Sequence, residues 1–591
     1  MNVREGSHDF LKGLLNIVIT MQDDSETIQS LSDDLIALIS LEDNIFSFYN
    51  EKRNVYAIQL NPTTNLIETT RKVLENFLFE ILHIEPKYTL EARLDETVNR
   101  LKLEIPNNRK IMVPLNGVDS LISYFILLKF VPKENLIGIF IDTGFLKAGE
   151  ADSAARLFES LGIFFQIIKA SIEFSSSCTT QSIEIDTFTT GVLKGKTSET
   201  SPPNGKNTNT KIELDTSYTE VRNVPIGPLN DSIVCPEQKK IIINDTFLRI
   251  IERKWKELDF TPETFLISQS TLRSDFIEDS CNQKDIRKNQ LRLLHFYKRQ
   301  KKVLEPLIEF YKDELRILGK NLNLDEKILN LPPFSNYGLA TRIICATEPY
   351  IDKDYQETTS LIKMIAGFNS MSKRPHPLLT KIKLALSEDE SLTLMNITAD
   401  KTLSAHLLPI KCSGMNSEPR PFGYACALSS SEPKPNWISL SFLASIMPKI
   451  SHHIKRVVYV FGDQVTFPIS DVTVTFLRKP IIDTLRLVDE NVSKVFDTAS
   501  LGKVNLLPTI LVPFHFDREP TQCNFGASIL RSVVIRPFIT TDYIFGRSAI
   551  PGQDIPEETV DKMKSAALSV PGLSRVLYDL TSSPPAFIEW E

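Results

Sequence analysis

The stretch IMVPLNGVDSLISYF, residues 111–125, decides the fold of this chain. The β-branched run at 111–113 predicts a strand, Gly117 predicts a tight turn, and an apolar helical pattern begins at Val118. A strand that turns on a glycine into a helix directs free backbone amides and the positive helix end toward one point. The stretch therefore predicts an anion site at the edge of a sheet.

Two polar residues at the start of this helix suit a phosphate ligand. Ser120 offers a hydroxyl group, and Asp119 offers a carboxylate that can hold a magnesium ion between phosphates. The plainer interpretation is an ordinary strand-to-helix turn with Asp119 as a helix-terminal carboxylate. Taken alone, residues 111–125 favour that plainer interpretation.

Around this loop, from about residue 110 to 275, short β-branched runs alternate with amphipathic stretches, which predicts a doubly wound parallel sheet. The expected strands are 111–113, 136–142, 163–168 and 264–268, and the expected helices are 118–130 and 148–161. At 175–230, Ser, Thr, Asn, Gly and Lys crowd around Pro202 and Pro203, a composition that buries little apolar surface. We expect most of 175–230 to be a mobile insertion.

The carboxyl-terminal third carries a weak internal repeat. One copy opens with LLPI at 407–410 and closes with RVVYVFGD at 456–463. The second opens with LLPT at 506–509 and closes with RVLYDLTS at 575–582. Each copy predicts strand, strand, helix, strand, with the second helix at 557–568. Chance similarity between two α+β segments is the alternative.

Bulk properties narrow the class of protein. The 591 residues allow about four domains, and 42% hydrophobic with 24% charged residues is near the average of soluble proteins. A net charge of −7 argues against a general nucleic-acid-binding surface. Seven cysteines without CxxC spacing indicate reduced thiols, hence the cytosol or the nucleus. The apolar runs 14–19 and 121–131 do not suit a membrane span, and no secretory signal is expected.

The loop at 111–125 resembles the SGGVDS pyrophosphate loop of the ATP pyrophosphatases, and further motifs point to one family among them. FIDTGFLKAGEA, residues 140–151, resembles the second nucleotide-binding stretch of the GMP synthetases. The likeness continues at SQSTLRSDFIED (268–279), EPLIEFYKDELRILG (305–319), YGLATRIICATEPY (337–350) and TSSPPAFIEWE (581–591). In combination these motifs are specific, and the chain is identified as resembling the eukaryotic-type GMP synthetase family.

The resemblance implies an α/β protein in three parts. Residues 1–84 would be a truncated class I amidotransferase remnant, and 85–346 an ATP pyrophosphatase domain with the insertion near 175–230. Residues 347–591 would be a duplicated α+β region for dimerisation and for binding xanthosine monophosphate (XMP), with repeats at about 400–465 and 505–591.

In this family, ammonia is released from glutamine, XMP is adenylated with ATP, and ammonia displaces AMP to leave GMP. The resemblance therefore implies ATP, Mg²⁺ and XMP as ligands and a homo-oligomer, or a heterodimer with a related enzyme, without nucleic acid or membrane. The implied ATP- and pyrophosphate-binding residues are Leu115, Asn116, Gly117, Val118, Asp119, Ser120, Asp142 and Gly144, with Asp119 as the metal ligand. The implied XMP-binding residues are Arg342, Arg531, Arg536, Ser583 and Glu591. For the arginines, surface ion pairing is the alternative.

The amidotransferase part departs from the family pattern. Residues 55–81 resemble the end of that domain, but its FHPE motif reads LNPT here, so Asn61 and Thr63 replace the base histidine and the orienting glutamate. The first cysteine of the chain is Cys178, already in the pyrophosphatase part. A thiol nucleophile with its base is therefore missing, and we predict loss of glutaminase activity with no catalytic residue assigned.

The synthetase part departs as well. Leu115 and Asn116 replace the first serine and glycine of the phosphate loop, and the KTHHN lid motif falls on DIRKN at 285–289. Tyr337 stands in a turn that the family keeps slim, and Ser583 replaces a phosphate-binding lysine. Each loss of a charge-assisted contact costs about 1.5 to 3 kcal/mol.

Two functional classes follow. The first is an enzyme that makes GMP from XMP, ATP and, at best, free ammonia. The second is a catalytically weak or inactive relative that binds a nucleotide or a protein partner. The substitutions favour the second class, unless other residues have taken over the lost contacts.

Overall fold

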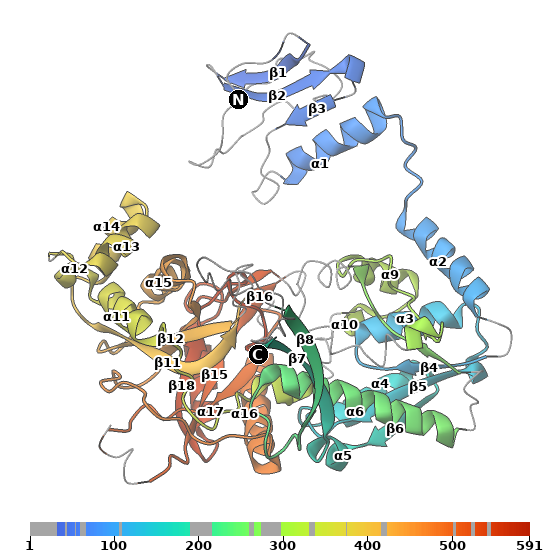
Figure 1. Ribbon diagram of the computed structural model, residues 1–591. Helices are drawn as coiled ribbons and strands as arrows, with labels where there is room; N and C mark the ends of the chain where they lie inside the picture. Colours follow the sequence, from blue (N-terminus) through green and yellow to red (C-terminus); the bar gives the residue numbers. More distant parts are fainter. Residues whose placement is uncertain are drawn as a thin grey trace, which may run out of the picture. The chain divides into compact units, whose positions relative to one another are not determined.

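The structure is a computed structural model that describes residues 32, 34–41, 44–53, 55–58, 67–105, 109–189, 216–258, 265–273, 297–329, 337–373, 375–414, 422–499, 504–519, 521, 526–540 and 545–591. Contacts divide the chain into two compact units, Met1–Glu96 and Thr97–Glu591. In the described part of the first unit, strands β1, β2 and β3 form an antiparallel sheet followed by helix α1 (Figure 1). Their bounds are Ile36–Leu41, Asn44–Asn50, Val55–Ile58 and Ile67–Glu75, and a π-helical turn follows at Asn76–Ile81. Helix α2, Leu90–Glu104, runs across the boundary between the units.

The second unit begins with a five-stranded sheet in the order β10-β9-β4-β5-β6, and every pair in it is parallel. The strands are β4 Lys110–Pro114, β5 Leu136–Asp142, β6 Phe165–Lys169, β9 Phe265–Ser268 and β10 Val303–Leu304. The intervening helices are α3 Val118–Leu128, α4 Glu150–Ser160, α5 Ser171–Ser175 and α6 Pro236–Glu257. This confirms the predicted parallel sheet, and β5 has the predicted bounds.

Helices cover both faces of this sheet. Phe140 of β5 contacts Phe158 of α4 on one face, with ring centroids 5.8 Å apart. On the other face Trp255 of α6 stacks on Phe265 of β9 at 3.8 Å, and Ile139 of β5 belongs to the same buried cluster as Trp255. Successive side chains of β5 point to opposite faces of the sheet, and both faces are apolar. Each face thus packs against helices, as in a doubly wound fold.

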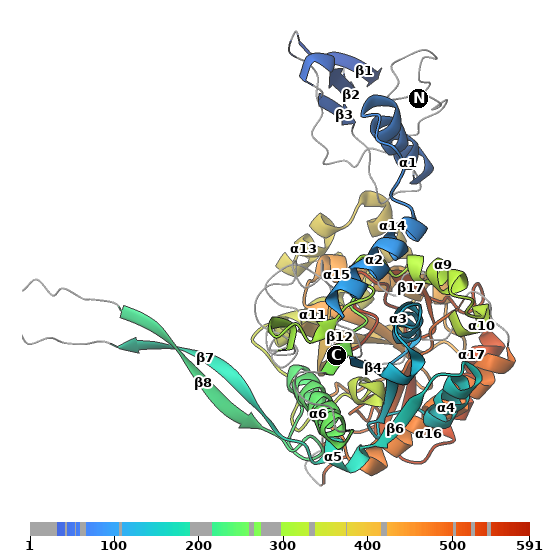
Figure 2. The same ribbon diagram turned by 90° about the vertical axis from the view of Figure 1, so that its right-hand side faces the viewer.

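Two stretches of the segment predicted to be a mobile insertion pair with each other as a two-stranded ribbon. Strands β7, Thr179–Thr189, and β8, Thr216–Ile226, pair antiparallel along all eleven positions, and the ribbon projects from the second unit in Figure 2. Both arms are rich in Thr, Val and Ile, which favour extended backbone. Residues 190–215 lie outside the described part of the chain.

After β10, helices α9 Glu314–Asn321 and α10 Glu326–Leu329 and the 3₁₀ turn η5 Gly338–Arg342 lead to a helical group. That group comprises α11 Tyr355–Ala366, α12 Phe368–Met371, α13 Pro377–Ala385 and α14 Glu388–Ile397.

The predicted repeat forms one six-stranded sheet in the order β11-β12-β13-β18-β15-β14. The first copy is β11 Leu403–Ser413, β12 Phe422–Ser430, α15 Trp437–Ile450 and β13 Ile454–Val460. The second is β14 Thr509–Val512, β15 Arg531–Ile535, α17 Glu557–Leu568 and β18 Leu573–Asp579, with the small pair β16 Phe538–Thr540 and β17 Gly546–Ser548 inserted. Helix α16, Lys479–Thr498, connects the copies. The strand, strand, helix, strand order of each copy is confirmed.

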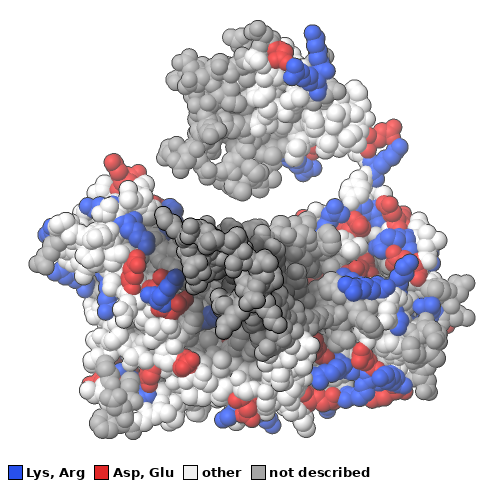
Figure 3. Space-filling view, viewed as in Figure 1, with Lys and Arg blue, Asp and Glu red and all other residues white. Residues whose placement is uncertain are grey.

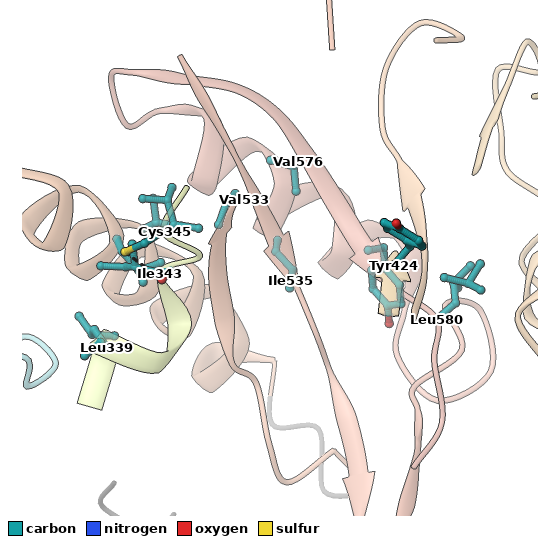
Figure 4. Packing of buried hydrophobic residues seen from close by; sticks show 14 of the residues in the cluster. Leu339, Ile343, Cys345, Tyr424, Val533, Ile535, Val576 and Leu580 are labelled. Carbon is teal, nitrogen blue, oxygen red and sulfur yellow. Dashed lines mark hydrogen bonds between the residues drawn. The ribbon is translucent and has the colours of Figure 1, made fainter. Parts of the chain in front are cut away.

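The two copies meet at β13 and β18, which pair antiparallel with Tyr459 opposite Tyr578. In each copy the first two strands are antiparallel and the last two parallel, so the sheet repeats about this central pair. One buried cluster runs from the parallel sheet into this second sheet, and Figure 4 shows its members near η5 and in the second sheet. It includes Ile343 and Cys345 next to η5 together with Val533 of β15 and Val576 of β18, so the two sheets share a core.

Candidate functional site

The loops at the carboxyl edge of the parallel sheet come together because β9, β4 and β5 are neighbours. The amide of Leu115 donates to the carbonyl of Ile139 at 2.8 Å, which keeps the loop after β4 beside the end of β5. Ser123 of α3 donates to Ser270 in the loop after β9 at 3.1 Å. Ligands of open α/β sheets bind at this edge, so it is the candidate site.

The phosphate loop closes on its own serine. The hydroxyl of Ser120 donates to the carbonyl of Gly117 at 2.7 Å and accepts from the amides of Asn116 and Gly117 at 2.8 and 3.1 Å. Gly117 has φ 149°, a conformation that favours glycine. Leu115 is fully buried, and Val118 begins α3. Ser120 thus holds the shape of the loop. The backbone amides in the first turn of α3, which begins at Val118, have no acceptor within the helix and are available to a ligand.

The predicted metal ligand, Asp119, forms an ion pair with Lys312. The ammonium nitrogen lies 2.8 and 2.6 Å from the two carboxylate oxygens, and both side chains are about a quarter exposed. Among the described residues, no group of three or more His, Cys, Asp or Glu side chains is arranged for a metal ion. Magnesium needs only one or two carboxylates when substrate phosphates complete its shell, so Asp119 fits the ion if Lys312 yields one oxygen.

The loop after β5 is held by side chains at both of its ends. Asp142 accepts from the amide of Gly144 at 2.9 Å, and Glu150 accepts from the amide of Lys147 at 2.7 Å. Gly144 has φ +82°, and a Cβ there would lie 2.7 Å from the Cβ of Ser171. The predicted residues Asp142 and Gly144 therefore sit together in a turn that only glycine fits.

A buried carboxylate joins this loop to Arg342. Asp489 of α16 lies 3.0 Å from Nζ of Lys147 and 3.5 Å from Nη1 of Arg342, and it accepts from the hydroxyl of Thr509 at 2.7 Å. Burial raises the pKa of Glu150 above its ordinary value, and the charges of Lys147 and Arg342 only partly offset this rise. Nη1 of Arg342 is buried and has no hydrogen-bond partner. Arg342 is therefore adjacent to the loop after β5.

Arg536 belongs to a fully buried charge cluster in the second sheet. It donates to Asp579 of β18, and Arg456 of β13 donates to the same carboxylate at 3.3 Å. Burial alone would raise the pKa of Asp579, but the two guanidinium groups outweigh it and lower that pKa below its ordinary value. Nε and Nη2 of Arg536 are buried without a partner. The cluster thus contains two guanidinium cations and one carboxylate, and some of the buried N–H groups of Arg536 have no acceptor.

The closing segment of the chain is tied to this cluster. The indole of Trp590 donates to Asp579 at 2.9 Å, and Arg456 donates to the carbonyl of Phe587 at 2.7 Å. The side chain of Glu591 pairs with Lys239 of α6 at 2.7 Å, and both are buried. Glu591, predicted to bind XMP, therefore already has a partner of opposite charge.

The remaining predicted residues lie nearby. Arg531 donates to the hydroxyl of Thr475 at 2.7 Å and to the carbonyl of Val474 at 2.8 Å, so its guanidinium is engaged. Ser583 is buried, and its amide donates to the carbonyl of Gly546 at 2.8 Å. Burial raises the pKa of Cys345 to about 11, and Lys239, Glu591 and Arg531 all act on that thiol.

Tyr337 packs onto α6. Its hydroxyl accepts from the amide group of Asn244 at 3.0 Å, and the next residue, Gly338, has φ +50°. Asn61, Thr63 and the lid positions 285–289 lie outside the described residues. Sequence reasoning missed five residues of the site. They are Lys239, Lys312, Arg456, Asp489 and Arg486 of α16, which donates to the carbonyl of Gly144. Lys312 and Arg456 each lie in a quoted motif, at 305–319 and 456–463, and these motifs were the available signals.

The described surface carries charged side chains of both signs. On the face in Figure 3, Lys and Arg side chains alternate with Asp and Glu side chains. No helix among the described residues is long and apolar enough to cross a membrane.

Comparison with known proteins gives the family. No protein-family model matches the chain. The chain is 30% identical to the glutamine-hydrolyzing GMP synthase of Dictyostelium discoideum over 565 residues, which is 92% of this chain and 71% of that protein. It is 28% identical to a probable GMP synthase of Caenorhabditis elegans over 612 residues, 97% of this chain and 76% of that one. A solved NH₃-dependent NAD synthetase from Campylobacter jejuni is 12% identical over 53% of this chain and 93% of that chain, with a TM-score of 0.23. The extent of the sequence matches confirms the resemblance drawn from the motifs, and the chain belongs to the GMP synthase family.

Proposed function

We propose that this chain makes GMP from XMP, ATP and free ammonia. The observation that carries the proposal is the sheet edge where the phosphate loop at Gly117–Ser120 lies beside the loop at Asp142–Gly144. Lys312 supports it further, because its ammonium group brings a positive charge to the phosphate loop.

In the proposed reaction, an oxygen of XMP attacks the α-phosphorus of ATP and pyrophosphate leaves. Ammonia then displaces AMP and leaves GMP. The start of α3 and Lys312 stabilise the departing pyrophosphate, and Asp142 with Gly144 holds the adenosine side. Mg²⁺ at Asp119 would supply charge neutralisation between the phosphates. Family resemblance assigns XMP to Arg342, Arg531, Arg536, Ser583 and Glu591.

The ammonia comes from solution in this proposal. Asn61 and Thr63 stand where the family has a base histidine and its orienting glutamate, so glutamine is not a nitrogen source. The reaction belongs to the cytosol or the nucleus, in keeping with the free thiols of the five described cysteines. An oligomer formed through the duplicated region is part of the same proposal.

A second candidate is a relative that binds nucleotide without catalysis. The Asp119–Lys312 ion pair favours it, because the one carboxylate assigned to magnesium already has a cation. The side chain of Leu115 favours it too, since the family has serine at that position of the loop.

Titration of the full chain with ATP and Mg²⁺, and separately with XMP, tests both candidates. The proposal expects both ligands to bind, and expects Asp119→Ala to abolish the magnesium-dependent part of ATP binding. Asp152→Ala is the matched control, an exposed acid in the first turn of the neighbouring helix α4. Binding of both ligands without GMP formation from ammonium would select the second candidate, and binding of neither would reject both.

A further inference from the structure

Helix α16 reaches from the duplicated region onto the loop after β5. Arg486 donates from Nη2 to the carbonyl of Gly144 at 2.6 Å and from Nε to the carbonyl of Leu146 at 2.9 Å. These two residues lie about 340 positions before Arg486 in the chain. One guanidinium group therefore holds two backbone carbonyls of the candidate adenosine-side loop in a fixed fork geometry.

Several other backbone groups of this loop have partners of their own. The amide of Phe145 donates to Thr143 at 3.2 Å, and the carbonyl of Phe145 accepts from Leu339 at 2.7 Å. The amides of Gly144 and Lys147 are bound to Asp142 and Glu150, as described above. The loop is thus preformed, and Arg486 supplies the bonds to its remaining two carbonyls.

Asp489 lies on the same face of α16 as Arg486, because residues three apart on a helix are neighbours. It adds a second connection between α16 and the loop after β5. Its carboxylate is 2% exposed and faces Lys147 from the loop and Arg342 from η5. Removing a carboxylate from water costs free energy that nearby cations offset. Asp489 therefore holds two cations, Lys147 of the loop and Arg342 of η5.

We propose that Arg486 and Asp489 are positioning residues for the nucleotide. In this inference, which rests on the proposed function, Arg486 keeps the loop at 144–147 ordered for ATP, a purine nucleoside triphosphate. Asp489 in addition orients Arg342 for the second nucleotide. The helix that connects the two repeats thereby sets the geometry of the ATP site. A loop ordered before binding does not spend binding free energy on becoming ordered.

The variants separate the two roles. Arg486→Gln removes both carbonyl bonds, and Arg486→Lys can restore one of them. Asp489→Asn keeps the shape of the side chain but releases Lys147 and Arg342. The matched control is Arg478→Gln, which removes an exposed ion pair with Asp231, 2.8 Å apart, at the start of the same helix.

The experiment measures ATP affinity with Mg²⁺, XMP affinity and the unfolding temperature of the full chain. We expect Arg486→Gln to weaken ATP binding roughly tenfold or more, Arg486→Lys to recover part of this loss, and XMP affinity to stay unchanged. Asp489→Asn should weaken both ligands, and Arg478→Gln neither. Equal losses of ATP and XMP affinity in Arg486→Gln, or no loss of either, would overturn the inference.

A second readout separates this inference from the proposed function. Amide hydrogen exchange of residues 143–149 without any ligand reports the order of the loop directly. We expect faster exchange in Arg486→Gln than in wild type or Arg478→Gln, even if the wild type fails to bind ATP. Unchanged exchange in Arg486→Gln would overturn the positioning role. Failure of the wild type to bind ATP would overturn the proposed function, and the exchange rates of the variant and the wild type would still decide the positioning role.

Discussion

Asp579 is the residue on which the second sheet depends most. Its carboxylate accepts from Arg536, Arg456 and Trp590, and all four side chains are buried. Removing one partner of a buried ion pair leaves a charge without compensation, which costs about 3 to 5 kcal/mol. Two buried guanidinium groups would be left together here. Asp579 therefore holds both the centre of the sheet and the closing segment of the chain.

We predict that Asp579→Asn lowers the free energy of unfolding by about 3 to 5 kcal/mol. Asp517→Asn is the matched control, because Asp517 pairs with Arg575, the residue of the second copy that corresponds to Arg456, at a site 43% exposed. An exposed pair is worth about 1 kcal/mol or less. Urea denaturation measures both variants, and equal losses would refute the special role of the buried cluster.

The same residue gives a pH dependence. Its folded-state pKa is lowered from the ordinary value of 3.8, so the unfolded chain takes up the proton first as pH falls. The stabilisation from ionised Asp579 is therefore complete above about pH 4 and declines as pH falls toward the lowered pKa. Wild type should lose stability in that range more steeply than Asp579→Asn. Parallel curves for the two proteins would contradict this assignment.

Ser583 tests the predicted XMP pocket at the scale of one residue. The family has lysine there, and serine supplies one neutral hydrogen bond in place of a full charge. We predict that Ser583→Lys raises XMP affinity roughly tenfold or more, as expected for a hydrogen bond to a charged group. The measurement is XMP titration of the two proteins. An unchanged affinity would mean that the phosphate of XMP does not lie near residue 583.

At the scale of elements, the loop after β5 depends on one glycine. Gly144→Ala would place a Cβ 2.7 Å from that of Ser171 at φ +82°, so we predict weaker ATP binding together with lower stability. Gly149→Ala is the control, because it has φ +67° but no atom within 4 Å of an added Cβ. Both variants carry backbone strain, and only Gly144→Ala adds a clash. ATP titration and thermal unfolding should rank Gly144→Ala as the worse variant, and the reverse order would refute the account of this loop.

The elements also explain how far the sequence could predict the fold. β5 and α17 have the predicted bounds, because β5 is a continuous apolar run and α17 an amphipathic stretch. The ribbon of β7 and β8 was missed, since the polar composition of 175–230 hides two arms whose stability comes from pairing with each other. The internal repeat was visible in 456–463 and 575–582, but not the pairing of Tyr459 with Tyr578 that joins the copies.

Only those parts of the candidate site that follow neighbouring strands of the parallel sheet were predictable from the sequence. The loops at Gly117 and Asp142 follow adjacent strands, so their proximity follows from the order of the sheet. Lys312 reaches Asp119 across 193 positions, and Arg486 reaches Gly144 across 342. The first contact depends on how the segment between β10 and α9 folds back onto α3, and the second on how α16 lies against the loop after β5. No local sequence pattern encodes either contact.

At the scale of the whole molecule, the charge cluster makes the two copies of the repeat unequal. Strand registers place Ser429 and Val460 of the first copy where the second has Arg536 and Asp579. Only the second copy therefore has a carboxylate at this place, and of its two guanidinium partners Arg536 comes from the second copy and Arg456 from the first. The site that we assign to XMP accordingly draws its charged residues from the second copy, together with Arg342 from the segment before the repeats.

The source of nitrogen tests the central claim most directly. The measurement is GMP formation by the full chain from XMP, ATP and Mg²⁺, with either ammonium or glutamine as the only nitrogen donor. We predict GMP from ammonium and none from glutamine above a blank, because Asn61 and Thr63 cannot activate a thiol. GMP from glutamine that a thiol alkylator abolishes, or no GMP from ammonium at saturating ATP and XMP, would contradict the account.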